Sequence, residues 1–203
     1  MKPLESTLNT PAKMPLKVLI IAACLLSLIV IIANYSVQFH LGDTPLTFGA
    51  LTYPFSFLLL DVLSEKYRRQ DVTKVIALAI CIAFYPSYLS ATSQIALASI
   101  AAFCISQPID VVIFYAFKRF FPKLWWLRNC FSTIFAQSFD TLIFFSFAFW
   151  GVKSFNECMD MAVADYMIKA FVGVMNTPLF YILAIRARCL WQKSTLESKR
   201  SRT

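Results

Sequence analysis

Hydrophobic residues gather in six long runs that are separated by short polar connections. The runs lie at about 16–38, 46–64, 72–90, 95–117, 129–150 and 164–186. The hydrocarbon core of a bilayer is about 30 Å thick, a distance that a helix of about 20 apolar residues crosses. The connections are too short to hold a separate soluble domain. The pattern therefore predicts an all-α, polytopic membrane protein with six transmembrane helices.

Composition supports this fold class. Hydrophobic residues make up 59% of the 203 positions and charged residues only 15%. Such a chain cannot keep a water-facing surface around a soluble core. We expect a polar leader at 1–15, a six-helix transmembrane domain at 16–187 and a basic, serine-rich tail at 188–203 that lies near anionic membrane lipid.

The basic residues follow alternate connections. Seventeen of the nineteen lie in the leader, the second and fourth connections and the tail, or within three residues of them at a span end, whereas the intervening connections hold only Lys153. Because Lys and Arg favour the cytoplasmic side of membrane proteins, both termini are predicted to be cytoplasmic. The formal net charge of +8 does not indicate a nucleic-acid partner, since the basic residues form no continuous face.

No motif for catalysis or metal binding occurs. The six cysteines stand at least 23 positions apart, which excludes the close pairs of metal and redox motifs. A single histidine, His40, and four glycines leave no hydrolase motif and no phosphate-binding loop. We therefore expect a protein that is not an enzyme and has neither a cofactor nor a metal.

Ionisable residues inside the predicted spans are the strongest functional signal, because a charge at mid-bilayer costs roughly 3 kcal/mol or more. Those that lie away from the extreme ends of their spans are Asp61, Asp110, Asp140 and Lys169. Asp61 lies only a few residues from the cytoplasmic end of its span, so an interfacial position near Arg68 is the alternative for this residue.

Spans four and five share a local pattern, Gln-x-x-Asp-x-x-Ile-Phe, which begins at Gln107 and again at Gln137. A spacing of three places each amide and carboxylate on one helix face. Two antiparallel helices would then present two such pairs, as in a transporter whose site lies between structural repeats. The alternative is that these groups only bond one another as packing contacts.

Lys169 enters the sixth span from the outer side, at a depth of about 10 Å, while Asp140 lies about 15 Å from the same side. We expect these two residues to form an ion pair, which would keep Asp140 ionised. The alternative is that Lys169 extends outward to Asp165, one turn earlier on its own helix.

Amides and aromatic rings accompany these charges. Asn34 and Gln38 lie one turn apart near the outer end of the first span, and aromatic residues follow on the second. Carboxylates can accept N–H groups, amides can donate to a carbonyl, and rings can stack on a planar ligand. This set favours a transporter for a small polar solute. A membrane interaction or assembly protein without a solute path is the second hypothesis.

Several motifs in order resemble the bacterial queuosine-precursor transporters, within the vitamin uptake transporter group. The resemblance covers about 34 to 180. It is carried by Asn34-Tyr-Ser-Val-Gln38, Phe48-Gly49, Tyr53-Pro-Phe-Ser-Phe57, Asp61, Gln107-Pro-Ile-Asp110, Phe114, Trp125-Trp126, Ser132-Thr133, Asp140-Thr141, Phe144-Phe145, Ala148-Phe149-Trp150, Asp165-Tyr166 and Lys169.

The resemblance implies a six-helix, multi-pass protein of the cell inner membrane that imports 7-cyano-7-deazaguanine and 7-aminomethyl-7-deazaguanine for tRNA queuosine salvage. Another small polar heterocycle or vitamin is the alternative substrate. We expect a monomer or a weak homodimer. The hypothesised substrate-binding residues are Asn34, Gln38, Asp61, Gln107, Asp110, Gln137, Asp140 and Lys169.

In this hypothesis the two carboxylates, Asp110 and Asp140, bind the N–H edge of the base. Gln107 and Gln137 bind its carbonyl or ring nitrogens. Asn34 and Gln38 would contribute at the outer side of the cavity, and Lys169 would act through Asp140.

Overall fold

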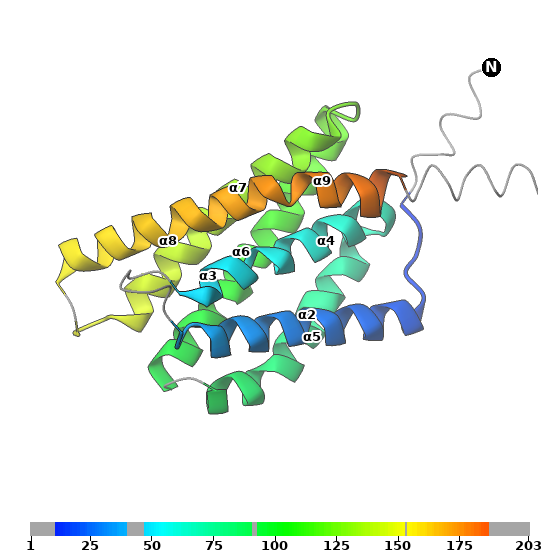
Figure 1. Ribbon diagram of the computed structural model, residues 1–203. Helices are drawn as coiled ribbons and strands as arrows, with labels where there is room; N and C mark the ends of the chain where they lie inside the picture. The colour runs from blue at the N-terminus through cyan, green and yellow to red at the C-terminus, as the bar shows by residue number, and fades with distance from the viewer. Residues whose placement is uncertain (1–10, 40–46, 91–92, 153, 187–203) are drawn as a thin grey trace, which may run out of the picture.

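A computed structural model describes residues 11–39, 47–90, 93–152 and 154–186. The predicted tail at 188–203 and most of the predicted leader lie outside these residues. Every regular element within the described ranges is a helix (Figure 1). They are α2 (Leu16–Ser36), α3 (Phe48–Thr52), α4 (Pro54–Lys66), α5 (Arg69–Ser90), α6 (Ser93–Phe120), α7 (Trp125–Ala148), α8 (Phe155–Met175), α9 (Thr177–Phe180) and the π-helix η1 (Tyr181–Arg186).

Five helical segments in the described chain are long and apolar enough to cross a membrane. They are Leu16–Ser36, Arg69–Leu89, Ser93–Phe120, Trp125–Ala148 and the continuous segment Phe155–Arg186. Each coincides with a predicted apolar run to within four residues at both ends, except that the last segment begins nine residues before the run predicted for it. The all-helical, multi-pass architecture predicted from the hydrophobic pattern is therefore confirmed.

The second apolar run is not one helix, as predicted, but two. It forms α3 and α4, which run end to end and meet where Tyr53 precedes Pro54 (Figure 1). Proline has no backbone N–H and cannot continue the hydrogen-bonding pattern of α3, but it suits the first position of a new helix. The single predicted helix at 46–64 is thus corrected to an interrupted pair over 48–66.

The last long helix begins nine residues before the predicted boundary at 164. Ser154 accepts a hydrogen bond from the backbone of Glu157, and the Glu157 side chain accepts one from the backbone of Ser154. This capping box starts α8 at Phe155. The prediction of a connection over 151–163 is therefore wrong beyond Ser154, because residues 155–163 belong to α8.

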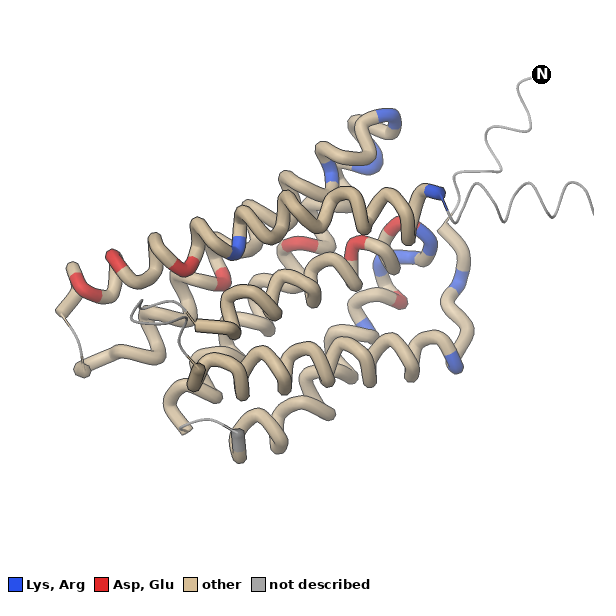
Figure 2. The backbone as a smooth tube through the Cα atoms, in the orientation of Figure 1, with Lys and Arg blue, Asp and Glu red and all other residues tan. Residues whose placement is uncertain are grey.

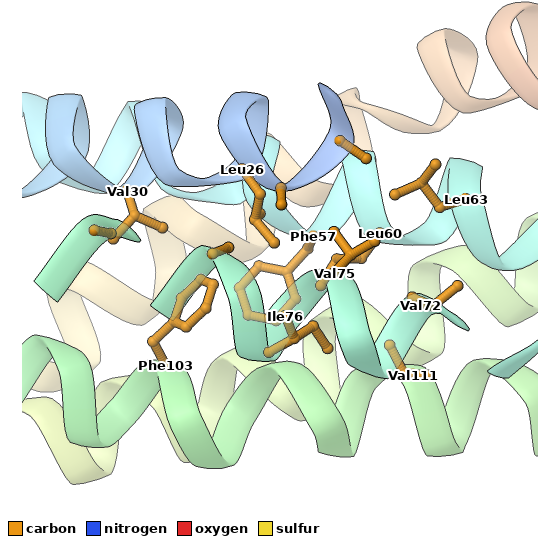
Figure 3. Close-up of a cluster of buried hydrophobic side chains, with 14 of the residues drawn as sticks. Leu26, Val30, Phe57, Leu60, Leu63, Val72, Val75, Ile76, Phe103 and Val111 are labelled. Carbon is orange, nitrogen blue, oxygen red and sulfur yellow. The ribbon is translucent and has the colours of Figure 1, made fainter. Parts of the chain in front are cut away.

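The apolar core lies between α2, α4, α5 and α6. Leu26, Phe57, Val75, Ile76 and Phe103 meet there with little or no exposed surface (Figure 3). The helices also carry many large apolar side chains on their outer faces. A bundle surrounded by lipid tolerates such exposure, whereas a protein in water rarely does.

Basic residues gather at one end of the bundle, from which the N-terminal segment leaves (Figure 2). We call it the basic end. Residues before α2 are held there, because the backbone of Ala12 pairs with the connection around Tyr67, and the Met14 N–H donates to Asp71 Oδ2 at 3.1 Å. By element, Lys66 lies in the last turn of α4, Arg69 begins α5, Lys118 and Arg119 lie in the last turn of α6, and Arg186 ends η1.

Gly49 allows α3 to approach the end of α2. A Cβ atom at this position would lie 2.6 Å from Val37 Cγ2 and 2.9 Å from the Ala33 carbonyl oxygen. Such overpacking costs about 1–3 kcal/mol. We expect Gly49→Ala to lower the thermal stability of the detergent-purified protein, whereas Thr52→Ala on the same short helix should not. Equal melting temperatures for wild type and Gly49→Ala would contradict this packing.

Candidate functional site

A cavity of about 540 Å³ lies toward the end of the bundle opposite the basic end. This volume is within the range of about 300–1,000 Å³ that small-molecule sites occupy. Its walls come from α2, α3, α5, α6, α7 and α8, including the last turns of α2 and α7 and the first half of α8. The polar side chains that line it are Asn34, Gln38, Thr47, Tyr53, Ser99, Asp140, Asp165 and Lys169.

Lys169 on α8 forms the charged centre of this cavity. Its Nζ atom lies 2.7 Å from Asp165 Oδ2 and 3.4 Å from Asp140 Oδ2. The predicted pair with Asp140 is confirmed, and the alternative contact with Asp165 is present as well and is the shorter of the two. The lysine is only 6% exposed, so its charge is neutralised mainly by these two carboxylates.

The second oxygen of Asp140 is bound from two further helical segments. Asp140 Oδ1 accepts hydrogen bonds from the Tyr53 hydroxyl at 2.8 Å and from Ser106 Oγ at 3.0 Å. One carboxylate on α7 thereby joins the α3–α4 junction, α6 and α8. The sequence analysis placed Tyr53 only among the aromatic residues and assigned Ser106 no role in the site.

Asp165 is a site residue that the sequence analysis missed, since it considered this side chain only as a partner for Lys169. Asp165 Oδ2 also accepts a hydrogen bond from Thr141 Oγ1 at 3.3 Å. The two aspartates and one lysine carry a surplus negative charge, so the centre can accept hydrogen bonds from N–H donors of a ligand. The i, i+4 spacing of Asp165 and Lys169 was the available signal.

Amide groups contribute on the α2 side of the cavity. Asn34 Oδ1 accepts a hydrogen bond from Ser99 Oγ at 2.6 Å, whereas its buried Nδ2 atom has no partner among the described residues. Because this Nδ2 atom is buried, the side chain has to turn before its N–H can donate to a ligand carbonyl. Gln38 lies one turn further along the chain and also lines the cavity.

Aromatic rings form another part of the wall. Phe145 and Phe149 stack with ring centroids 5.6 Å apart, and Phe144 meets Phe145 edge to face at 5.3 Å. Lys169 Nζ lies 5.1 Å from the Tyr53 ring centroid and 5.9 Å from that of Phe144. The cavity therefore combines flat apolar surfaces with a few placed polar groups, as sites for planar heterocycles do.

The other four predicted residues do not line the cavity. Asp61, Gln107, Asp110 and Gln137 are completely buried, displaced from the cavity toward the basic end. Thr133 Oγ1 donates to Asp61 Oδ2 at 3.2 Å. Asp61 therefore faces the interior of the bundle, in contact with α7.

Gln107 connects this inner region to α4, because its Nε2 atom donates to Ser56 Oγ at 3.0 Å. Gln137 has no hydrogen-bond partner for either side-chain atom in the described chain. A Cβ atom at Gly173 on α8 would lie 3.1 Å from Thr133 Cγ2 and 3.5 Å from Gln137 Nε2. Because Gly173 has no Cβ atom, the side chains of Thr133 and Gln137 can pack directly against the backbone of α8.

Ion pairs join three helices at the basic end. Glu65 Oε2 at the end of α4 lies 2.8 Å from Arg128 on α7 and 3.6 Å from Lys118 on α6. Lys118 Nζ also donates to the backbone carbonyl of Ser64 at 2.9 Å. We call these contacts the basic-end ion pairs. They hold α4, α6 and α7 together on the side away from the cavity.

No group of three or more His, Cys, Asp or Glu side chains within the described ranges is placed to hold a metal ion. The arrangement is instead a closed bundle with one charged cavity that is large enough for a small molecule. Fold and site together define a multi-pass membrane protein with a candidate binding site for a small polar solute.

Comparison with known families identifies the class more closely. Residues 47–183 match the family model described as "Putative vitamin uptake transporter". This range covers more than half of the chain and includes most of the cavity wall. The chain therefore belongs to this transporter family, and the predicted resemblance is confirmed.

Three similar proteins carry related names. The chain is 32% identical to the "Probable queuosine precursor transporter" of Bacillus subtilis over 66% of this chain and 70% of the relative. It is 29% identical to the protein of the same name in Haemophilus influenzae, over 64% of each chain. It is 27% identical to the "Queuosine precursor transporter" of Escherichia coli, over 77% of this chain and 81% of the relative. No solved structure matches the chain.

The ion pairs around Lys169 predict a large effect on stability. Removing one partner of a buried ion pair costs about 3–5 kcal/mol, because the remaining charge has no counterion. We expect Lys169→Met to lower the melting temperature of the detergent-purified protein strongly. The double variant Lys169→Met/Asp140→Asn should recover part of the loss, since an asparagine can still bond Tyr53 and Ser106. A single variant as stable as the wild type would contradict this role.

Proposed function

We propose that the protein imports queuosine precursors, such as 7-cyano-7-deazaguanine and 7-aminomethyl-7-deazaguanine, across the bacterial inner membrane. The observation that carries the proposal is the 540 Å³ cavity with Asp140, Asp165 and Lys169 at its centre. The names of the three relatives support the substrate class.

The orientation follows from the charges. Because basic residues favour the cytoplasm, the basic end lies on the cytoplasmic side and the cavity faces outward. The interrupted pair α3 and α4 counts as one crossing, since together they cover 48–66. Together with the five continuous spans this makes six crossings in our proposal, and an even number of crossings is consistent with both termini on the cytoplasmic side.

The chemistry of the cavity suits a 7-deazaguanine base. The base is planar, and one edge carries an amino group and a ring N–H that a carboxylate can bind together. Asp165 is the better placed acceptor, because its contacts with Lys169 and Thr141 both involve Oδ2, whereas both Asp140 oxygens have partners within the protein. Of the amides that line the cavity, Gln38 carries the N–H donors for the ring carbonyl, and the phenylalanine rings cover the apolar faces.

The basic-end ion pairs close the opposite side in this conformation. An importer must open toward the cytoplasm after it binds its substrate, so α4, α6 and α7 have to separate where Glu65 meets Arg128 and Lys118. The outward cavity and the closed basic end together correspond to one of the two states that alternating access requires.

A purely structural role for the polar residues is the competing hypothesis. Packing contacts account for the bonds of Asp140, but they do not account for a cavity of this size or for an unpartnered amide beside it. Uptake measurements with other planar heterocycles decide between this substrate class and another small polar ligand.

Uptake should depend on the carboxylates of the cavity. We expect Asp140→Asn and Asp165→Asn to reduce uptake at least about tenfold, because loss of a buried charged partner costs about 2 kcal/mol or more. The measurement uses cells that cannot make the precursor, given labelled 7-cyano-7-deazaguanine, with queuosine in tRNA as the readout. Asp160→Asn, which changes an exposed carboxylate on α8, the helix of Asp165, is the matched control. Full activity in both cavity variants, with the proteins in the membrane, would contradict the site.

Weakening the basic-end ion pairs should open the cytoplasmic side. Cys130 lies near these pairs on α7, where its Sγ atom contacts Thr177 Oγ1 at 3.1 Å. With the other five cysteines replaced by serine, we expect Glu65→Gln to increase labelling of Cys130 by a membrane-impermeant maleimide several-fold in inside-out vesicles. The parent protein without Glu65→Gln sets the basal rate. Unchanged labelling would show that these pairs do not close the pathway.

A further inference from the structure

Two carboxyl groups lie together in the inner part of the bundle, outside the cavity. Asp61 on α4 and Asp110 on α6 are both 0% exposed, and their side chains lie within interacting distance of each other. We call them the inner acidic pair. Nothing in the proposed recognition of the base by the cavity uses this pair.

The oxygens of the inner acidic pair lack donors. Asp110 Oδ1, Asp110 Oδ2 and Asp61 Oδ1 have no hydrogen-bond partner in the described chain, and only Asp61 Oδ2 receives a bond, from Thr133. Ser132 lies beside Asp110, but its hydroxyl donates to the Asn129 carbonyl at 3.4 Å. Buried acceptors without donors are costly, and a structure that keeps them generally binds something there.

No Lys, Arg or His side chain of the described residues forms an ion pair with Asp61 or Asp110, in contrast to the other buried acids. Asp140 has Lys169, and Glu65 has Arg128 and Lys118. On the neighbouring α7, the titratable side chain close to Asp61 is the uncharged thiol of Cys130. The charged residues of α5, which are Arg69, Asp71 and Lys74, lie in the first two turns of that helix, Lys17 lies in the first turn of α2, and Arg186 ends η1.

Two adjacent carboxylates in such a place repel each other strongly, because the interior has a low dielectric constant. A proton held between them removes one charge and turns one carboxyl group into the donor that the other oxygens lack. A larger cation would need several oxygen ligands around an open space, whereas a proton needs none. The observed contacts therefore favour a proton.

We propose that Asp61 and Asp110 form a proton-binding site that couples uptake to the proton gradient. This coupling rests on the proposed function, since the site lies between the outward cavity and the basic-end ion pairs. The pair binds one proton and carries a charge of −1 in that state. It releases this proton to the cytoplasm when the basic end opens, which leaves a charge of −2 until the next proton enters.

The first experiment tests the site without any substrate. Infrared spectra of the purified protein in lipid at neutral pH should contain the C=O stretching band of a protonated carboxyl group, which shifts in heavy water. Asp61→Asn and Asp110→Asn should each remove this band, whereas Asp160→Asn should keep it. The absence of the band in wild-type protein, or its persistence in both variants, would overturn the proposal.

The second experiment tests the coupling in reconstituted vesicles with labelled 7-cyano-7-deazaguanine. Wild-type protein should concentrate the label several-fold when the side facing the cavity is acidic. In Asp110→Asn the label should only reach equal concentrations inside and outside the vesicles. The variant protein should still exchange labelled for unlabelled precursor. Accumulation driven by a sodium gradient alone, or exchange without any response to the pH gradient, would overturn the proton coupling and leave the importer function intact.

Absence of any exchange by wild-type protein would contradict the proposed substrate instead. The infrared experiment then still decides whether the inner acidic pair holds a proton, so the two proposals fail in distinguishable ways.

Discussion

The buried carboxylate of Asp140 is the contact on which the arrangement of the bundle depends. Its two oxygens bind Tyr53 at the α3–α4 junction, Ser106 on α6 and Lys169 on α8. A charge at this depth is stable only because these partners replace water. The same contacts fix the position of Lys169 and thereby of Asp165, so the interaction that holds the helices together also forms the polar surface of the cavity.

Three polar regions follow one another through the bundle. The cavity lies toward one end, the inner acidic pair lies deeper, and the basic-end ion pairs close the other end. The interrupted pair α3 and α4 contributes to all three, through Tyr53, Asp61 and Glu65. A broken helix beside a central site is typical of transporters, because two short segments can move separately where one continuous helix cannot.

The hydrophobic pattern predicted most of the fold, since spans of about 20 apolar residues have few alternatives in a membrane. It did not predict the break at Pro54, because hydrophobicity alone does not register the missing backbone N–H of proline, and it set the start of α8 too late by treating Ser154 and Glu157 as part of a connection. The Asp140–Lys169 pair was predictable from helical depth. The roles of Tyr53 and Asp165 were not, because contacts between helices determine them. The shared pattern that begins at Gln107 and Gln137 marked two polar helix faces. It could not show that Asp140 would line the cavity whereas Asp110 would lie deeper in the bundle.

The central claim is that the substrate occupies the cavity around Lys169. Thr47 lines this cavity at the start of α3, and its side chain makes no capping hydrogen bond, so Thr47→Cys in a cysteine-free background introduces a reporter with little disturbance. The most direct measurement is the rate at which an impermeant maleimide labels this cysteine from outside. The account predicts that 7-cyano-7-deazaguanine slows the labelling in proportion to its occupancy. Transport of the precursor with an unchanged labelling rate would contradict the account.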